Sequence, residues 1–498
     1  MKLYVLIFLL AGSVPAAFAQ KAVATIELKV KNVDEGLITV TLPVHHTVFW
    51  GASRVDTLRS GKPHIISLDN TQTGYVHLDV FNRAIRLFVQ SGNKLSVTID
   101  EENETQPLII TGDNREGQLL LSSNELVYAG NQITRYKTDT TAALLTQHVE
   151  EDKKVRQSVF KALFDEKKID KAFYDFAILT LDYYHAALIS EVVFSKYAVT
   201  TLAPNHPQYK PVFAPEWGAL WERIYKQYPV NDPAALRTFG YNDGFNTYAG
   251  NYIMGYLSWI QSKQGSPKPP QNWSVEIQQI IQRIQNNMQP EVAEYVEATI
   301  LVTELGLEKN YKDLLSLADA FRKKFPQSRY LPYMEPLINK ARAYLNRAGG
   351  EFTEDQKMVP DYAAINSFAE LVNKFRGKPL FVEFWSSWCF TCKEEFKNGP
   401  ELQKFLQSKD ITHLFISVDH QVALQEWKEM IKYYDLKGYH VRANPSLQKS
   451  ISNIFWNGKG TPLPLYVIID ASGNIVEFDA LRPSEKKNLY RQIESKLR

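Results

Sequence analysis

The sequence predicts a multidomain α+β protein, and three observations support this fold class. The chain has 498 residues, a length typical of about three domains. Hydrophobic residues make up 44% of it and aromatic residues 12%, which is enough for packed cores. The apolar pattern changes along the chain, from short strands to long helices and then to alternating strands and helices. We therefore expect a leader at 1–20, a β-rich domain at 21–118, a helical region at 119–345, a linker at 346–360 and an α/β domain at 361–498.

The first segment, "MKLYVLIFLLAGSVPAAFAQ", has the layout of a secretory signal peptide. It has one lysine, an apolar run from Leu3 to Ala11 and the small-residue pattern Ala17-Phe18-Ala19, so we expect cleavage before Gln20. The apolar run is shorter than an ordinary membrane span. We expect a periplasmic protein in an oxidising compartment, and an uncleaved inner-membrane anchor is the alternative.

The β-rich domain is predicted from alternating strands separated by turn signals. "ATIELKVKNV" and "LITVTLPV" alternate around "DEG", and "AIRLFVQSGNKLSVTID" repeats the pattern around Ser91-Gly92-Asn93. We expect a β-sandwich or a small barrel. His45 and His46 are adjacent on a strand and would face opposite sides, so they predict no metal site.

The middle region is predicted to be helical because its apolar residues recur every three or four positions. Examples are "DKAFYDFAILTLDYYHAALISEVVFSKY" and "KDLLSLADAFRKKF". Proline-rich breaks at 203–215 and 265–271 divide the helices into groups. The aromatic stretch at 245–259 is expected to pack rather than to bind a ligand. Residues 347–350 end the helices, and "EFTEDQKMVPDYA" is typical of a linker.

The C-terminal domain alternates strand and helix patterns. "KPLFVEFW", "THLFISVD", "PLYVIID" and "NIVEFDA" are predicted strands, and "INSFAELVNKF", "CKEEFKNGPELQKFLQS", "LQEWKEMIKYY" and "SEKKNLYRQIESKL" are predicted helices. This alternation predicts a sheet that is covered by helices on both faces.

The segment "WSSWCFTC" holds the only two cysteines of the chain, Cys389 and Cys392. A disulfide across so small a loop stabilises the folded chain by about 2 kcal/mol, against about 3 for a fifteen-residue loop. It would therefore contribute little to the stability of so long a chain. Zinc would need two more ligands at a matched spacing, which the sequence lacks. We expect redox chemistry, with no metal and no cofactor. A formal net charge of +2 gives no sign of nucleic-acid binding.

Three stretches carry a family resemblance: "GKPLFVEFWSSWCFTCKEEF", "LFISVDHQVALQEWKEMIKYYDLKGYHV" and "PLPLYVIIDASGNIVEFDALRPSE". With them the C-terminal domain resembles the TlpA/ResA-like exported thiol-disulfide oxidoreductases, which have a thioredoxin fold. The stretch "FVQSGNKLSVTIDEENETQPLIITGDN" resembles the β-rich domain that precedes this module in Bacteroidota proteins. Two departures are visible. Lys397 stands where the family often has proline, with Pro400 nearby, and the dipeptide Phe390-Thr391 lacks the common proline.

The two cysteines are expected to have unequal roles. Cys389 falls where a strand has ended and a helix begins, so backbone N–H groups and the helix dipole would stabilise its thiolate. It is the predicted nucleophile. Cys392 lies one turn into the helix, is expected to be more buried, and would resolve the mixed disulfide by attacking Cys389.

Two acidic residues are candidates for proton handling. Strand alternation places Glu383 on an apolar face with Phe381 and Trp385. The resemblance implies that Glu383 is a buried acid with a raised pKa, which exchanges a proton with Cys392; the alternative is an edge carboxylate that meets water. Glu395 matches an acidic position of ResA-like proteins and is a candidate for pKa tuning, with a solvated helix residue as the alternative.

The resemblance also implies a substrate-binding surface. Pro464 matches the cis-proline that faces the cysteine pair, with Pro462 as the competing candidate. Its cis bond would turn the backbone of Leu463 outward to pair with an extended substrate. Trp388 is expected to cover the sulfur and shape this surface, or else simply to pack.

We expect an exported thiol-disulfide oxidoreductase that reduces protein disulfides. Its partners would be protein thiols and disulfides and a membrane-bound electron donor. One alternative is a non-enzymatic binding protein with a regulatory or vestigial thiol pair. Another is a peroxiredoxin-like peroxidase, which is disfavoured because the usual Pro-x₃-Thr-x₂-Cys pattern is absent before Cys389.

Overall fold

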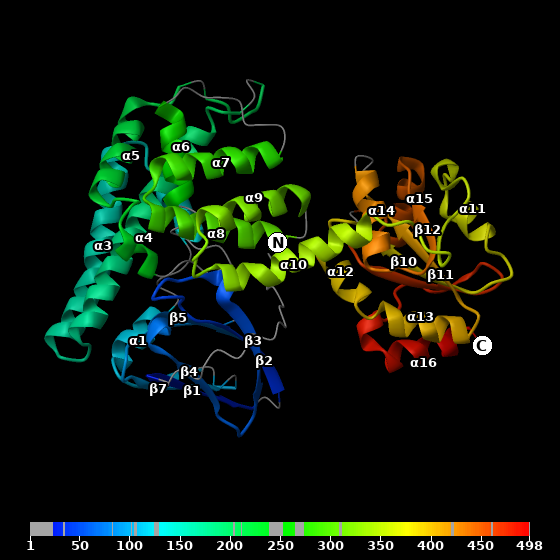
Figure 1. The fold of residues 1–498 in the computed structure, drawn as a ribbon, viewed down its shortest axis with the longest axis horizontal. Coiled ribbons are helices and arrows are strands. Elements are labelled where there is room, and N and C mark those ends of the chain that lie inside the picture. Colours follow the sequence, from blue (N-terminus) through cyan, green and yellow to red (C-terminus); the bar gives the residue numbers. More distant parts are fainter. Residues whose placement is uncertain are drawn as a thin grey trace. The chain divides into compact units, whose positions relative to one another are not determined.

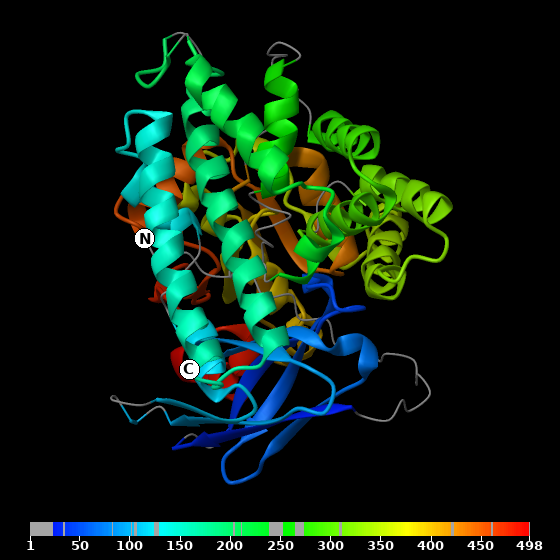
Figure 2. The ribbon, with the colours of Figure 1, turned by 90° about the vertical axis from the view of Figure 1, so that its left-hand side faces the viewer.

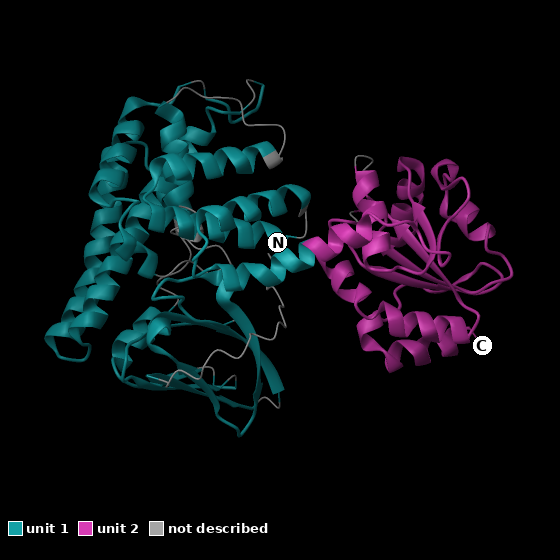
Figure 3. Cartoon of the chain, viewed as in Figure 1, with its two compact units in different colours: residues 1–341 teal, residues 342–498 magenta. Residues whose placement is uncertain are grey.

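The chain folds into a mixed α/β protein with two compact units, Met1–Ala341 and Arg342–Arg498 (Figures 1 and 3). The computed structural model describes residues 23–497 except 33–34, 82, 101, 104–106, 124–128, 203–204, 211, 239–251, 264–272, 308–310, 420–422 and 460–461. The predicted leader at 1–20 therefore lies outside the described residues.

The first unit begins with two four-stranded sheets. One has the order β4-β1-β7-β8 and the other β3-β2-β5-β6, and the β1–β7 pair is parallel. The strands are β1 (Ala24–Lys31), β2 (Glu35–Thr41), β3 (Ser53–Arg59), β4 (His64–Leu68), β5 (Gly74–Val80), β6 (Arg83–Val89), β7 (Lys94–Asp100) and β8 (Leu108–Gly112). Alternate residues of β1 are buried, as expected for a strand with one face on a core. Apolar side chains from both sheets join one hydrophobic cluster.

Helices follow the two sheets in the first unit. They are α1 (Arg115–Leu121), α2 (Ala129–Tyr136), α3 (Ala142–Asp165), α4 (Lys171–Ala198), α5 (Pro215–Gln227), α6 (Met254–Lys263), α7 (Trp273–Asn287), α8 (Pro290–Gly306), α9 (Tyr311–Lys324) and α10 (Leu331–Ala348); the last of these, α10, continues past Ala341 into the second unit. The hydroxyl of Thr141 caps α3 and the carboxylate of Asp170 caps α4, each accepting a backbone N–H. Figure 2 shows α3 and α4 side by side.

Helix α4 is a long and largely apolar helix. Of the described helices, it alone is long and apolar enough to cross a membrane, but 78% of its most apolar window is buried inside the protein, as in a core helix. The predicted break at 203–215 falls between α4 and α5, and Pro215 opens α5. The second predicted break, at 265–271, lies outside the described residues. In the aromatic stretch, Tyr252 is buried and packs on Tyr225.

The second unit is built on a six-stranded mixed sheet with the order β14-β13-β10-β11-β12-β9. Its strands are β9 (Gln356–Met358), β10 (Leu380–Trp385), β11 (Thr412–Ser417), β12 (Gly438–Arg442), β13 (Leu465–Ile469) and β14 (Ile475–Glu477). Strand β10 pairs in parallel with β11 and antiparallel with β13. Part of the range predicted as a linker, 346–360, belongs to this sheet, because β9 pairs in parallel with β12.

Helices cover both faces of this sheet, as the alternation of strands and helices predicts (Figure 1). They are α11 (Phe368–Asn373), α12 (Phe390–Phe396), α13 (Gly399–Ser408), α14 (Leu424–Tyr433), α15 (Pro445–Phe455) and α16 (Lys487–Lys496). Leu380, Val382 and Phe384 pack in a cluster with α11 and α15, whereas Phe381 packs with α13 and α16. Strand β10 is therefore buried on both faces and fixes the position of the segment that follows it.

Candidate active site

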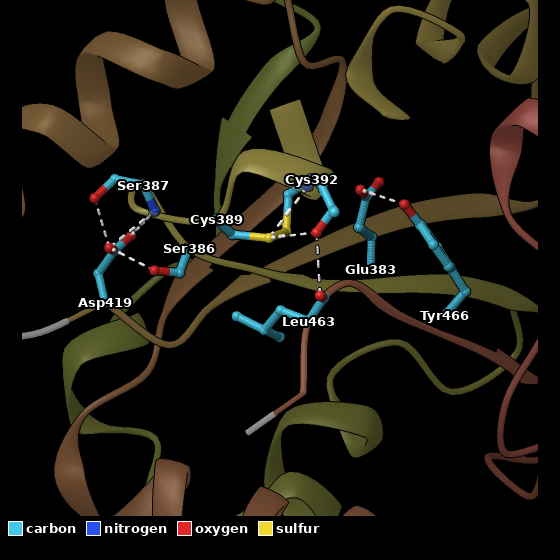
Figure 4. Close-up of a disulfide and its surroundings, with 9 residues drawn as sticks. Glu383, Ser386, Ser387, Cys389, Cys392, Asp419, Leu463 and Tyr466 are labelled. Carbon is cyan, nitrogen blue, oxygen red and sulfur yellow. Dashed lines mark hydrogen bonds between the residues drawn. A yellow bond between two sulfur atoms is a disulfide. The ribbon is translucent and has the colours of Figure 1, made fainter. Parts of the chain in front are cut away.

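The two cysteines lie where β10 ends and α12 begins, and they form a disulfide (Figure 4). Cys389 is the residue that caps the N-terminus of α12, because its Sγ accepts a hydrogen bond from the backbone N–H of Cys392 at 3.1 Å. A helix N-terminus leaves backbone N–H groups without partners inside the helix, and here a sulfur takes one of them. The sulfur of Cys389 therefore lies where a negative charge is stabilised.

The burial of the two cysteines follows the predicted order, but the difference is small. Cys392 is 0% exposed and Cys389 is 4% exposed. Of the two sulfur-bearing residues, only Cys389 reaches the surface at all. This supports an attack by Cys389 rather than by Cys392.

Leu463, directly before Pro464 and β13, lies next to the cysteine pair (Figure 4). The Leu463–Pro464 peptide bond is cis. The hydroxyl of Thr391, between the two cysteines, donates a hydrogen bond to the carbonyl oxygen of Leu463 at 3.2 Å. Trp388 is 46% exposed, so it is not a packed core residue.

Glu383 is buried on β10, on the Cys392 side of the disulfide (Figure 4). The hydroxyl of Tyr466 donates to its Oε1 at 3.1 Å, because Tyr466 is its direct cross-strand partner on β13. On the other side, the Nε2 of His413 lies 3.4 Å from Oε2. His413 reaches the carboxyl diagonally from β11, where it pairs with Phe381.

The charge state of this group is set by burial. Burial raises the pKa of the Glu383 carboxyl to about 8; the hydrogen bond from Tyr466 opposes the rise and the charge of Glu395 adds to it. Burial also lowers the pKa of His413 to about 3, so its ring is uncharged near neutral pH. The contact between Glu383 and His413 is therefore not an ion pair at neutral pH.

Glu395 is held in place rather than solvated. Its carboxylate accepts the backbone N–H and the hydroxyl of Ser484, both at 2.9 Å, and the residue is buried. Glu395 and Glu383 line one pocket of about 250 Å³ together with His413. Exposed Lys404 also lines it, so the pocket reaches the surface. The volume holds several water molecules, at about 30 Å³ each in the liquid.

The departure from the family at Lys397 has a structural counterpart. The stretch predicted as one helix forms two, α12 and α13, with the break at Lys397 and Asn398. Pro400 lies in the first turn of α13, where its missing N–H costs nothing. The chain thus bends directly after the active-site helix.

A buried polar network before Cys389 escaped the sequence analysis. Asp419, after β11, is fully buried. Its carboxylate accepts hydrogen bonds from the hydroxyls of Ser386 (3.0 Å) and Ser387 (2.7 Å) and from the backbone N–H of Ser387 (2.9 Å) (Figure 4). It also accepts one from the hydroxyl of Ser417 (2.7 Å). The network fixes the turn between β10 and Cys389. The sequence signal that could have indicated this network is a pair of polar segments at the ends of two apolar strands, "WSS" and "ISVD".

The disulfide of Cys389 and Cys392 lies at the start of a helix, and thiolates exchange with disulfides by attacking one of the two sulfurs. The second unit is a thiol-disulfide oxidoreductase with a thioredoxin fold. The AhpC/TSA family model matches residues 357–478. Thiol-disulfide oxidoreductase ResA from a strain of Bacillus cereus is 31% identical over 136 residues, which are 26% of this chain and 73% of that protein. The chain belongs to the ResA thiol-disulfide oxidoreductase family through this region.

Other similar proteins cover the same part of the chain. ResA from Bacillus thuringiensis subsp. konkukian is 26% identical over 137 residues, 26% of this chain and 73% of that protein. A putative thiol-disulfide oxidoreductase from Bacteroides vulgatus is 25% identical, covering 25% of this chain and 82% of that one, with a TM-score of 0.21. A thiol:disulfide interchange protein from Chlorobium tepidum is 24% identical, covering 24% and 83%, also with a TM-score of 0.21.

Asp419→Asn should destabilise the protein. An amide cannot accept all four hydrogen bonds, and each buried donor left unpaired costs about 1–3 kcal/mol. Thermal unfolding of the full chain should show a lower midpoint. The matched control is Asp410→Asn, at an exposed position with a positive φ that asparagine tolerates. Equal midpoints for the two variants would contradict the role of the network.

Glu383→Gln should change how stability depends on pH. The folded-state pKa is about 8 and the ordinary value 4.5, so the folded protein binds a proton that the unfolded chain releases between these values. In the wild-type protein, the contribution of Glu383 to the free energy of unfolding falls as pH rises from about 4.5 to about 8. The variant lacks this loss, so its melting temperature relative to wild type should rise from pH 5 to about 8 and level off above that. A constant difference across that range would show that the carboxyl is not buried as described.

Proposed function

We propose that the protein reduces disulfide bonds of other proteins through Cys389 and Cys392. The observation that carries this proposal is the hydrogen bond from the Cys392 N–H to the Cys389 sulfur. In the reduced protein that donor would stabilise a thiolate, the form of cysteine that attacks disulfides. The small exposure of Cys389 and the complete burial of Cys392 support the same division of roles.

The reaction needs two exchange steps. The Cys389 thiolate attacks one sulfur of the substrate disulfide, whose S–S bond breaks and leaves a substrate thiolate. Cys392 then loses its proton and attacks Cys389, which releases the second substrate sulfur. Two electrons pass from the cysteine pair to the substrate, which takes up two protons as it becomes a dithiol.

Glu383 is proposed to exchange the proton of Cys392. Its carboxyl lies on the Cys392 side of the disulfide (Figure 4), and its pKa of about 8 is close to that of an ordinary thiol, about 8.5. Similar values allow a proton to pass in either direction at small cost. Tyr466 donates a hydrogen bond to the carboxyl, His413 lies against it, and the pocket beside it would let the proton reach solvent. Glu395 would tune Glu383 through its charge.

Substrate docking is proposed for the surface around the pair. Exposed Trp388 directly precedes Cys389 in the chain, and the carbonyl of Leu463, before Pro464, contacts Thr391 beside the pair. An extended substrate segment would pair with the Leu463 backbone and pack on the indole.

The setting of this chemistry is also proposed. The leader pattern at 1–20 supports export to the periplasm, with a membrane-bound dithiol donor that reduces the pair again. We further propose that the two N-terminal sheets form a β-sandwich domain at 21–118. The helical region at 119–345 would then separate this domain from the redox domain at 361–498 along the chain.

Variants of single cysteines test the division of roles. Cys392→Ser should trap mixed disulfides with exported proteins, because no resolving thiol remains. Cys389→Ser should trap few, because the buried thiol cannot attack. Non-reducing electrophoresis with mass spectrometry measures both. Equal capture by the two variants, or capture by Cys389→Ser alone, would overturn the assignment of the nucleophile.

Glu383→Gln should slow disulfide exchange near pH 7, by about a hundredfold if the carboxyl carries the proton. Insulin reduction followed by turbidity measures the rate. Glu394→Gln is the matched control, since Glu394 lies close to the cysteine pair in the sequence but bonds Lys397 at the surface. A rate for Glu383→Gln equal to that of the control would make the buried carboxyl a bystander.

A further inference from the structure

The side chain of Thr391 lies between two hydrogen-bond acceptors of the active site. Its Oγ1 is 3.2 Å from the carbonyl oxygen of Leu463 and 3.4 Å from the Sγ of Cys389. Thr391 is exposed, and Leu463 lies beside the disulfide (Figure 4). One hydroxyl from the dipeptide between the cysteines thus contacts both the attacking sulfur and the proposed docking backbone.

A hydroxyl has one hydrogen, so it donates to one acceptor at a time. In the disulfide form the sulfur is uncharged and a weak acceptor, whereas a backbone carbonyl is a strong one. The hydroxyl hydrogen is therefore donated to the carbonyl oxygen of Leu463, which is the stronger and the nearer acceptor.

Reduction makes the sulfur of Cys389 a stronger hydrogen-bond acceptor than the carbonyl oxygen of Leu463. A dithiol donor supplies two electrons, the bond between the sulfurs of Cys389 and Cys392 breaks, and the donor becomes a disulfide. Of the two protons that the donor loses, one goes to Cys392 and the other to solvent, which leaves Cys389 as a thiolate. Hydrogen bonds to charged acceptors are roughly twice as strong as neutral ones. The Thr391 hydroxyl then gains more by donating to the thiolate than to the carbonyl.

We propose that Thr391 is a redox-dependent positioning residue, whose hydroxyl binds the Leu463 carbonyl in the disulfide form and the Cys389 thiolate in the dithiol form. This rests on the proposed function, in which a substrate strand pairs with the Leu463 backbone. In the dithiol form that carbonyl accepts an N–H from the substrate. In the disulfide form the Thr391 hydroxyl competes for it. The reduced protein thus binds its substrate more tightly than the oxidised protein binds the product.

Two substitutions separate the hydroxyl from the shape of the side chain. Thr391→Val removes the hydroxyl and keeps the branched shape, whereas Thr391→Ser keeps the hydroxyl. In a Cys392→Ser background, thiolate absorbance titrates Cys389 without disulfide formation. Loss of a hydrogen bond to a charged group should lower the thiolate fraction near neutral pH about tenfold in Thr391→Val. The thiolate fraction of Thr391→Ser should stay close to that of the parent Cys392→Ser protein. Equal titrations of Cys389 in Thr391→Val and Thr391→Ser would contradict a hydrogen bond from the Thr391 hydroxyl to the thiolate.

The second measurement is the binding of an extended peptide in which serine replaces cysteine, to oxidised and to reduced full-length protein. Wild type and Thr391→Ser should bind it several-fold more tightly when reduced. Thr391→Val should lose most of that difference because its oxidised form binds more tightly. If reduction raised the peptide affinity of Thr391→Val as much as that of wild type, the Thr391 hydroxyl would not compete with the peptide for the Leu463 carbonyl. A wild type that fails to reduce insulin would contradict the proposed function alone, since the thiolate titration reports on Thr391 independently of turnover.

Discussion

The active site depends on one hydrogen bond, from the backbone N–H of Cys392 to the sulfur of Cys389. That bond exists because Cys389 occupies the N-cap of α12, a position fixed from both sides. Strand β10 is buried on both faces and anchors the chain before the turn. The carboxylate of Asp419 then holds Ser386 and Ser387, so that the chain leaves the strand in one conformation. A shift of the turn would move the sulfur away from its donor.

The same strand places an acid in a buried position. Glu383 lies among apolar residues of β10, and the cost of ionising it there is what brings its pKa near that of a thiol. Tyr466 and His413 contact the carboxyl without neutralising it, since neither is charged near neutral pH. The pocket lined by Glu383 and Glu395 gives the acid a link to the surface. The buried acid lowers stability at high pH, and it provides a group that can accept and return a proton.

Sequence alone predicted the features that depend on local pattern. The change from strands to helices and back and the two-sided burial of β10 follow from the pattern of short segments. The cis bond before Pro464 was implied by the family resemblance and not by the local pattern. Contacts between distant segments could not be predicted in this way. Asp419 meets Ser387 across 32 positions and Thr391 meets Leu463 across 72. Such contacts require the pairing of strands and the position of loops, which periodicity does not specify.

We propose that the position of Cys389 at the start of α12 makes it the reactive thiol. Alkylation of the reduced protein by iodoacetamide, followed across pH and resolved for each cysteine by fragmentation mass spectrometry, tests it most directly. Cys389 should be labelled first, with a pH midpoint below the ordinary thiol value of about 8.5, while Cys392 should be labelled far more slowly. Equal rates for the two cysteines, or faster labelling of Cys392, would contradict it.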